Sequence, residues 1–254
     1  MAVDEAILVC YGEGLVLPTL RLYSWEPPCL SIGYLQSVGK GIDVESCRQR
    51  GIALVRRPTG GRALLHEDEL TYSLVCALSH PCASGGVVQS YRKISQGILT
   101  GLRLLGVEAV ALPAPERMVT KTATESCFAT TSHYEVTVKG RKLVGSAQLR
   151  RDGALLQQGT IPFALDAGKL FCLLKRPGED PSLWIQRFLG RAISLNEALG
   201  RPRQWDEVAQ ALQAGFEQAF GITFVEGELT GQEEKLARRL EQTKYATPQW
   251  NFLR

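Results

Sequence analysis

The chain lacks the features that mark membrane proteins, secreted precursors and nucleic-acid-binding proteins. No apolar run approaches the ~18 residues that a membrane span needs, and no basic region leads the sequence as in a signal peptide. The formal net charge is only +3 over 254 residues, so charge gives no argument for nucleic acid or a lipid surface as a partner. Internal repeats and low-complexity tracts are absent as well. We therefore expect a globular protein whose partners are neither nucleic acid nor membrane.

Cysteine usage excludes a disulfide framework. The seven cysteines are odd in number and scattered, and no CxxC pair occurs among them. Such usage fits a reducing compartment, so we expect a cytoplasmic protein. Cys76, His80 and Cys82 lie close together in the sequence, but a fourth ligand at sensible spacing for zinc is missing. The sequence therefore predicts no metal site.

The pattern of apolar residues predicts a mixed fold. They make up 44% of the sequence, enough for one sizeable domain. Helical spacing and capping residues predict helices over residues 2–11, 43–50, 87–105, 167–174, 181–189, 205–220 and from 230 onward. Extended patterns predict strands over 52–55, 71–77, 107–112, 134–138, 141–149, 155–163 and 222–225, and a proline-interrupted strand pair over 23–34. Because the strands cluster into meanders, the fold class is predicted to be α+β.

One predicted hairpin places a thiol and an amine in the same region. Cys127 precedes the strand over 134–138, and Lys142 follows the turn at Lys139 and Gly140, so the returning strand brings Lys142 toward the start of the first. A free cysteine with a pKa near 8.5 is only ~3% thiolate at neutral pH, and a fixed cation that lowers the pKa by ~1.5 units raises this to about half. The alternative is that Lys142 is a solvated strand residue and Cys127 an ordinary loop residue.

A second segment, Arg56 to His66, has the composition of a ligand-binding loop. Gly60 and Gly61 follow a strand, and without Cβ atoms they let the backbone approach a ligand closely. The GxxxxGK spacing of a Walker loop is missing. Equally simple interpretations remain, with the glycines as a plain turn, Arg57 as an ion-pair partner and His66 as a hydrogen-bonded structural residue.

Several motifs together resemble one family. The segments RRPTGGRALLHEDELTYS, YEV, GRKLVGSAQ, LLQQGTI and TKYATPQWNF occur in this order and resemble the octanoyltransferase branch of the lipoate–protein ligase superfamily over nearly the whole chain. The resemblance implies the biotin/lipoate-protein ligase catalytic-domain fold, a mixed, mostly antiparallel sheet flanked by helices. We expect this domain over residues 1–200, with residues 201–254 as a helical extension packed on it.

The resemblance also implies roles for individual residues. Cys127 falls on the acyl-carrying nucleophile, and Lys142 on the lysine that lowers its pKa. The substrate-binding residues implied are Arg57, Gly60, Gly61, His66, Gly145, Ser146, Ala147, Gly159 and Thr160. The implied reaction moves octanoyl from octanoyl-acyl carrier protein through a cysteine thioester to a lysine of a lipoyl domain, such as the glycine-cleavage H protein. It requires no cofactor, because transfer from thioester to amide runs downhill.

Other functions stay open at this point. An ATP-dependent lipoate ligase shares the fold and the RRPTGG segment, although ligases often carry a third glycine where this chain has Arg62 and a histidine where it has Gln158. An amidotransferase moving octanoyl between lipoyl domains, or a binding module with an inert pocket, is also compatible. Arg56, Arg57 and Arg62 suit the docking of an acidic carrier protein, or else form a solvated basic rim.

Overall fold

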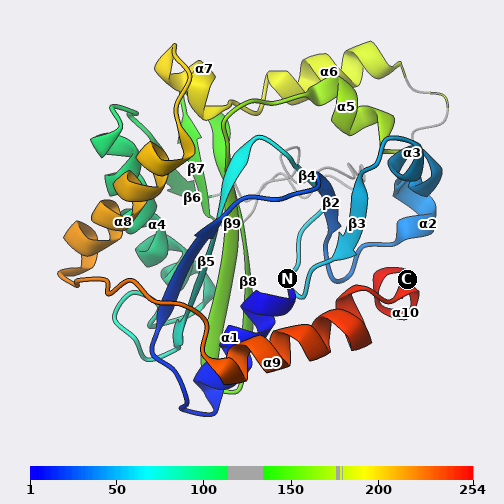
Figure 1. Cartoon of the computed structure of the whole chain (residues 1–254). Helices are drawn as coiled ribbons and strands as arrows, with labels where there is room; N and C mark the ends of the chain where they lie inside the picture. Colours follow the sequence, from blue (N-terminus) through cyan, green and yellow to red (C-terminus); the bar gives the residue numbers. More distant parts are fainter. Residues whose placement is uncertain (114–133, 176–177, 179, 254) are drawn as a thin grey trace.

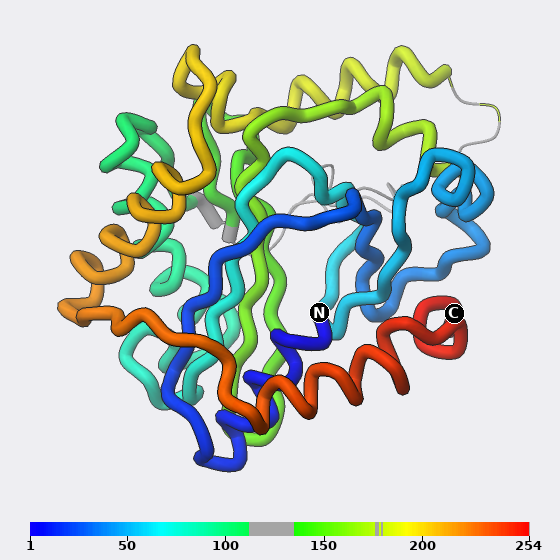
Figure 2. The backbone as a smooth tube through the Cα atoms, viewed as in Figure 1, coloured from blue at the N-terminus to red at the C-terminus, as the bar shows by residue number. Residues whose placement is uncertain are grey.

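The computed structural model describes residues 1–113, 134–175, 178 and 180–253, and within them the chain forms two sheets surrounded by helices (Figures 1 and 2). The described strands are β1 (Thr19–Tyr23), β2 (Cys29–Ile32), β3 (Ala53–Arg56), β4 (Leu64–His66), β5 (Glu69–Ala77), β6 (Val110–Pro113), β7 (Tyr134–Val138), β8 (Arg141–Arg151) and β9 (Ala154–Pro162). The described helices are α1 (Ala2–Gly12), α2 (Val38–Gly41), α3 (Val44–Gln49), α4 (Val87–Leu104), α5 (Ala167–Cys172), α6 (Pro181–Leu189), α7 (Leu195–Leu199), α8 (Trp205–Phe220), α9 (Gly231–Leu240), the π-helical η2 (Glu241–Tyr245) and α10 (Pro248–Asn251).

The larger sheet has the order β1-β5-β9-β8-β7-β6, and the smaller has the order β3-β2-β4. Among the described strands only β2 and β3 run parallel; all other described pairs are antiparallel. The predicted α+β class with a mostly antiparallel sheet is therefore confirmed. None of the helices in the described part of the chain is long and apolar enough to cross a bilayer.

Helices cover the two faces of the larger sheet differently. On one face α4 and α8 pack over β5, β8 and β9, and Ile94, Leu102 and Phe216 are completely or almost completely buried there. On the other face α1 packs against β5 and β9 through Ile7 and Leu8. The rest of that second face is left to the smaller sheet, which lies beside α2, α3, α5 and α6 (Figure 1). The two sheets therefore meet beyond the end of α1.

The local signals in the sequence correctly mark most turns and helix ends. Lys139 and Gly140 have φ values of 48° and 77°, the conformation of a two-residue hairpin turn, and Asp152 and Gly153 repeat it at 51° and 77°. The side chains of the predicted N-caps Asp43, Asp180 and Thr230 accept hydrogen bonds from backbone N–H groups of the first helical turn.

Two predictions about strands are wrong. The proline-interrupted segment 23–34 is not a strand pair, because β1 pairs with β5 in the larger sheet while β2 pairs with β3 and β4 in the smaller one. Residues 222–225 are not a strand. Val225 is 91% exposed, and an isolated β-branched segment without a pairing strand gains nothing from its propensity.

The C-terminal helices share the core and the charges of the preceding part. Val208, Leu212 and Phe216 of α8 are buried in the same cluster as α4. Beyond α9, Lys244 donates a hydrogen bond to Glu5 of α1 at 2.7 Å and Tyr245 donates one at 2.5 Å. The domain boundary at residue 200 stays a prediction, but residues 201–253 complete the core and do not form one of their own.

Glu5 is the acceptor on which this contact between the two ends of the chain depends. Its carboxylate is buried and also accepts a hydrogen bond from Arg151 at 3.0 Å. Burial raises the pKa of Glu5, but the hydrogen bonds and charges of Lys244, Tyr245 and Arg151 outweigh it, and the net pKa is lowered.

We expect Glu5→Gln to lower the free energy of unfolding by about 2 kcal/mol at neutral pH, because it weakens hydrogen bonds between charged groups. Because the pKa of Glu5 is lower in the folded protein than in the unfolded one, its ionised form stabilises the fold above the unfolded-state pKa, and this stabilisation is lost as the pH falls through the folded-state pKa. The difference in free energy of unfolding between the two proteins should therefore shrink below about pH 4.3. Urea unfolding across pH checks this. Glu13→Gln, at an exposed glutamate just past α1, is the matched control and should change stability by less than about 0.5 kcal/mol; a pH-independent difference for Glu5→Gln would contradict the assignment.

Candidate active site

A pocket lies where the two sheets meet, and six of the predicted site residues line it. These are Arg57, His66, Gly145, Ser146, Ala147 and Gly159. The remaining lining residues are Met1, Tyr23, Ser31, Thr59, Leu64, Thr71 and Gln158. Residues that are far apart in the sequence thus form one wall, contributed by β1, β2, β4, β5, β8 and β9. Lys142, Gly60, Gly61 and Thr160, which were also predicted, lie outside this lining.

His66 is held by a chain of buried polar groups. Its Nδ1 lies 2.6 Å from Oε1 of Glu69, and its Nε2 lies 2.7 Å from Oγ of Ser31. A carboxylate only accepts, so Nδ1 carries a hydrogen toward Glu69, and Nε2 of the neutral ring accepts from the Ser31 hydroxyl. Arg57 Nη1 donates to the same hydroxyl oxygen at 3.0 Å, which leaves the hydroxyl hydrogen for His66.

An aromatic ring and a threonine complete this arrangement. Trp25 stacks on the imidazole of His66 at 4.4 Å between ring centroids and an interplanar angle of 21°. The indole N–H of Trp25 donates to Oγ1 of Thr71 at 2.9 Å, and the Thr71 hydroxyl donates in turn to Glu69. His66 is therefore confined in position, orientation and tautomer by groups from β2, β5 and the loop before β2.

Arg57 braces the glycine loop. Its guanidinium donates to the carbonyl oxygens of Gly60 at 2.9 Å and Arg62 at 2.7 Å. Gly61 has φ +95°, and a Cβ at this position would lie 2.7 Å from Arg57 Nη2. The loop thus needs glycine at position 61 for its turn and for contact with the arginine, whereas a Cβ at Gly60 would meet no atom within 4 Å.

The structure corrects the proposal that three arginines form a docking rim. Arg56 and Arg57 are 0% and 5% exposed, and their guanidinium groups donate to backbone carbonyls inside the protein. Arg57 is also not simply an ion-pair partner, because carbonyls and a hydroxyl surround it. Burial and internal hydrogen bonding make both side chains unavailable to a carrier protein, and Arg62 is the partly exposed member of the three.

Two of the predicted substrate residues have structural reasons of their own. A Cβ at Gly159 would lie 2.3 Å from the ring of Tyr72, so glycine lets the aromatic ring pack against β9. The Ser146 hydroxyl hydrogen-bonds the Tyr72 hydroxyl at 2.7 Å, on the α4 side of the sheet. Ser146 and Gly159 are paired across β8 and β9, and their neighbours Gly145 and Ala147 face the opposite side.

Lys142 is held in place by both its side chain and its backbone. It is 4% exposed, and Nζ donates to Oε1 of Glu135 on β7 at 2.7 Å. Its amide donates to the carbonyl of Arg191 at 2.7 Å, and its carbonyl accepts from Ile193 at 3.0 Å. The alternative of a solvated strand lysine is therefore wrong. Although Lys142 pairs with Thr137 near the turn, its ammonium reaches back to Glu135, close to where the strand begins.

The other member of the predicted pair, Cys127, lies outside the described residues. Thr160, another of the predicted substrate residues, pairs with Gly145 across β8 and β9. Its Oγ1 is buried and has no hydrogen-bond partner in the part of the chain that the structure describes. Because Thr160 is completely buried and lies outside the pocket lining, its predicted role in substrate binding stays a prediction.

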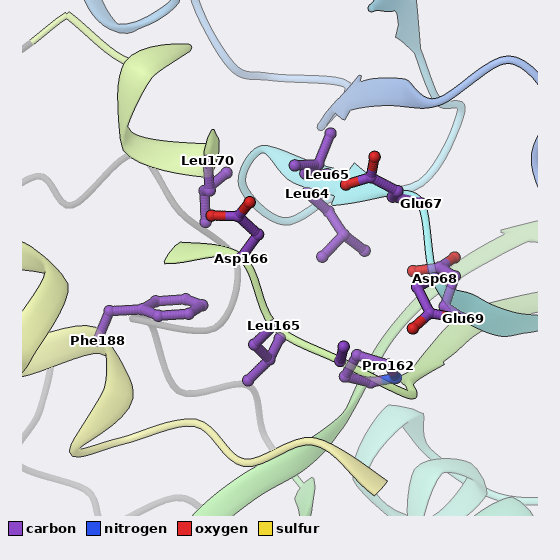
Figure 3. Close-up of a pocket in the computed structure, with 11 residues that line it drawn as sticks. Leu64, Leu65, Glu67, Asp68, Glu69, Pro162, Leu165, Asp166, Leu170 and Phe188 are labelled. Atoms are coloured by element: carbon purple, nitrogen blue, oxygen red, sulfur yellow. The ribbon is translucent and has the colours of Figure 1, made fainter. Parts of the chain in front are cut away.

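A second depression adjoins the pocket and is lined differently (Figure 3). Its floor is apolar, with Leu64, Leu170 and Phe188, and carboxylates such as Asp68 and Asp166 stand around it. Its cavity volume is about 80 Å³. None of the predicted site residues lines this depression, so we assign the chemistry to the pocket beside His66.

Three polar residues of the site were missed by the sequence analysis. Ser31 and Glu69 bind His66, and Glu135 binds Lys142. The Glu135 contact had a usable signal, since in a hairpin turning at 139–140 residues 137 and 142 face each other and residue 135 is the next on that face. The Ser31 contact had none, because β2 and β4 meet only in the tertiary structure.

We expect Gly61→Ala to lower the free energy of unfolding by about 1–3 kcal/mol, because alanine is strained at φ +95° and its Cβ displaces the Arg57 guanidinium. Gly60→Ala is the matched control, with open space and an ordinary φ, and should change stability by less than about 0.5 kcal/mol. Equilibrium urea unfolding of both variants measures the difference. Equal costs would show that the loop does not have the conformation described.

Comparison with known proteins places the chain in a family. A sequence profile described as "Lipoyl protein ligase A/B catalytic domain" matches residues 1–217. The octanoyltransferase LipM of Kyrpidia tusciae is 45% identical over 256 residues, covering 99% of this chain and 93% of that protein. The octanoyltransferase LipM of Bacillus subtilis is 40% identical over 259 residues, covering 100% of this chain and 93% of that protein.

A solved structure supports the same placement. The bipartite lipoate protein ligase of Thermoplasma acidophilum, from an archaeal lipoylation system, matches with a TM-score of 0.82 and 28% identity, covering 99% of this chain and 89% of that chain. The predicted lipoate-ligase fold is thereby confirmed. The chain belongs to the lipoyl protein ligase A/B catalytic-domain family, and within it to the octanoyltransferases named LipM.

Proposed function

We propose that this chain transfers an octanoyl group from octanoyl-acyl carrier protein to the lysine of a lipoyl domain, through a thioester on Cys127. Octanoyl transfer in lipoate biosynthesis is the activity of its relatives, and the identity of 45% over the full length is the observation that carries the proposal. The buried Lys142 and the ordered pocket beside His66 support it. The donor, the acceptor, such as the glycine-cleavage H protein, and the nucleophile are the parts being proposed.

In the first half-reaction the Cys127 thiolate attacks the thioester carbonyl of the octanoyl-carrier protein. The new carbon–sulfur bond replaces the old one, and the carrier leaves as a thiolate that takes a proton from solvent. Exchange of one thioester for another is near equilibrium, so no nucleotide is consumed. Lys142 supplies a positive charge for the thiolate from a strand position that leaves it little freedom.

In the second half-reaction the ε-amine of the acceptor lysine attacks the octanoyl-enzyme. An amide forms as the bond to Cys127 breaks, and the departing Cys127 sulfur takes up the proton that the amine loses. The greater stability of an amide over a thioester makes this half-reaction effectively irreversible.

Glu135 has a definite place in this scheme. Its carboxylate orients Lys142, but its negative charge also offsets part of the effect of the ammonium on a neighbouring thiol. The lowering of the Cys127 pKa by ~1.5 units that Lys142 alone would cause is therefore an upper limit. The Glu135–Lys142 ion pair therefore stabilises the thiolate less than a lone ammonium would, but it holds the lysine in a fixed position.

The described walls of the pocket also limit the size of the group that fits between them. They enclose about 30 Å³, room for roughly two water molecules by the usual measure. An eight-carbon chain is larger than this space, so the acyl group extends beyond it or enlarges it when it enters.

The nucleophile can be tested by intact mass analysis after incubation with octanoyl-carrier protein. We expect wild-type protein to gain the mass of one octanoyl group, and Cys127→Ser to gain none because it lacks the thiol. Cys172→Ser is the matched control, since Cys172 is an exposed thiol on α5, and it should acylate normally. An adduct that survives Cys127→Ser would contradict the proposal.

The same assay separates the second candidate, an ATP-dependent ligase, which the likeness to the Thermoplasma acidophilum ligase favours. Transfer to a lipoyl domain without nucleotide supports the octanoyltransferase. Activity only with free octanoate or lipoate and ATP would replace it. Octanoylated lipoyl domain offered as donor in place of the carrier protein distinguishes an amidotransferase in the same experiment.

The contribution of Lys142 and Glu135 can be read from the pH dependence of Cys127 alkylation. We expect Lys142→Met to raise the pKa of Cys127 toward 8.5 by removing the cation, and Glu135→Gln to lower it by about one unit by removing the opposing charge while keeping a hydrogen-bond acceptor. Peptide mass spectrometry after iodoacetamide treatment measures the rate at each cysteine, with Cys172 as internal reference. Identical Cys127 profiles in all three proteins would show that Lys142 does not lie beside it.

A further inference from the structure

Far from the pocket, at the other end of β5, three metal-binding side chains converge. Cys76 Sγ and Cys82 Sγ lie 3.8 Å apart, and His80 Nδ1 lies 2.9 Å from Cys82 Sγ. All three ligand atoms lie within 4.8 Å of one another. β5 runs from Glu69, which contacts His66, to Ala77, so this cluster lies about seven residues along the strand from the proposed active site.

The cluster is set into the protein rather than displayed on a mobile tip. Cys76 is completely buried on β5 within the core under α4, and Cys82 is almost completely buried. The intervening turn is fixed by hydrogen bonds from the amides of Ala83 and Ser84 to the carbonyl of His80, each 2.8 Å long. His80 is partly exposed, which leaves one side of the cluster open to solvent.

The separation of the two sulfurs matches the one that a tetrahedral zinc ion imposes. Two Zn–S bonds of about 2.3 Å at the tetrahedral angle place the sulfurs about 3.8 Å apart, and a Zn–S and a Zn–N bond place sulfur and nitrogen about 3.5 Å apart. The sulfurs already have this separation. The imidazole of the partly exposed His80 lies closer to Cys82 than that, at 2.9 Å, so its ring has to move outward by about half an ångström when the ion binds.

We propose that Cys76, His80 and Cys82 form a zinc site with three protein ligands and solvent at the fourth position. Thiolate and imidazole ligands select Zn²⁺ over hard cations such as Mg²⁺ or Ca²⁺. Two thiolates and one Zn²⁺ are together neutral, so binding buries no net charge. The two thiol protons are released to solvent, and the affinity therefore rises with pH.

The three side chains already contact one another, because the sulfurs of Cys76 and Cys82 share a hydrogen bond and His80 Nδ1 hydrogen-bonds Cys82 Sγ. The sequence predicts no metal at Cys76, His80 and Cys82, because a fourth protein ligand is missing. The structure shows that the three residues converge without one, and an open fourth position is compatible with zinc.

The site would fasten the turn before α4 to the sheet and is independent of the proposed acyl transfer. We expect the reduced protein to bind one equivalent of Co²⁺, used as a spectroscopic substitute for zinc, with the near-ultraviolet charge-transfer absorption that thiolate ligands produce. Saturating Zn²⁺ should raise the melting temperature by roughly 5–10 °C. Both measurements use the full chain with Cys127→Ser, so that the proposed nucleophile cannot contribute, and with a phosphine reductant to prevent a Cys76–Cys82 disulfide.

Three variants in that background decide the matter. Cys82→Ser and His80→Ala should each weaken binding by more than ~100-fold, beyond what the loss of an outer-shell partner costs, and Cys82→Ser should abolish most of the charge-transfer band. Cys172→Ser, which removes an exposed thiol outside the cluster, should leave both unchanged. His80→Ala guards against a folding defect, since His80 lies on a turn and not in the core. Undiminished Co²⁺ absorption in Cys82→Ser, or no binding in the background protein, would overturn the proposal.

Discussion

Two adjacent arginines at the end of β3 connect the active-site loop to the rest of the molecule. Arg57 fastens the glycine loop and the Ser31 hydroxyl beside His66, while the completely buried guanidinium of Arg56 donates to the carbonyls of Gly33, Tyr34, Gln36, Trp250 and Asn251. Neighbouring side chains of an extended segment point in opposite directions, so Arg56 contacts α10 while the next residue, Arg57, contacts the site. A buried cation that loses its acceptors is expensive. The loop, the smaller sheet and the C-terminus therefore have to form together.

The division of the larger sheet into two faces explains where chemistry is possible. One face is closed by α4 and α8, and Tyr72 fills the space that Gly159 leaves on that side. The other face is covered by α1 at one end only, and beyond it lie Gly145, which has no side chain, and Ala147, whose side chain is a single methyl group. Residues of that size leave space between the two sheets, and the pocket lies there.

Within the site, much of the sequence-based prediction rests on local signals, and these were reliable. The hairpin register that brings Lys142 back along β7 follows from a two-residue turn with positive φ at both positions, and the N-cap residues begin the helices where expected. Predictions that depended on contacts with residues distant in the sequence were not reliable. Residues 222–225 have strand propensity without a neighbouring strand, and Arg57 looked like a surface charge because nothing in its own segment shows that carbonyls will surround it.

The sequence by itself therefore determined the class of the fold, the meander of β7, β8 and β9, and the glycine loop, because each depends on residues a few positions apart. The hairpin register already favours the pairing of Glu135 with Lys142, but only the tertiary structure decided that Ser31 and Glu69 bind His66 and that Cys76, His80 and Cys82 converge. Hydrogen bonds and ion pairs between buried groups depend on distances of about 3 Å between atoms. Such distances are set by how whole sheets pack and not by the pattern of any single segment.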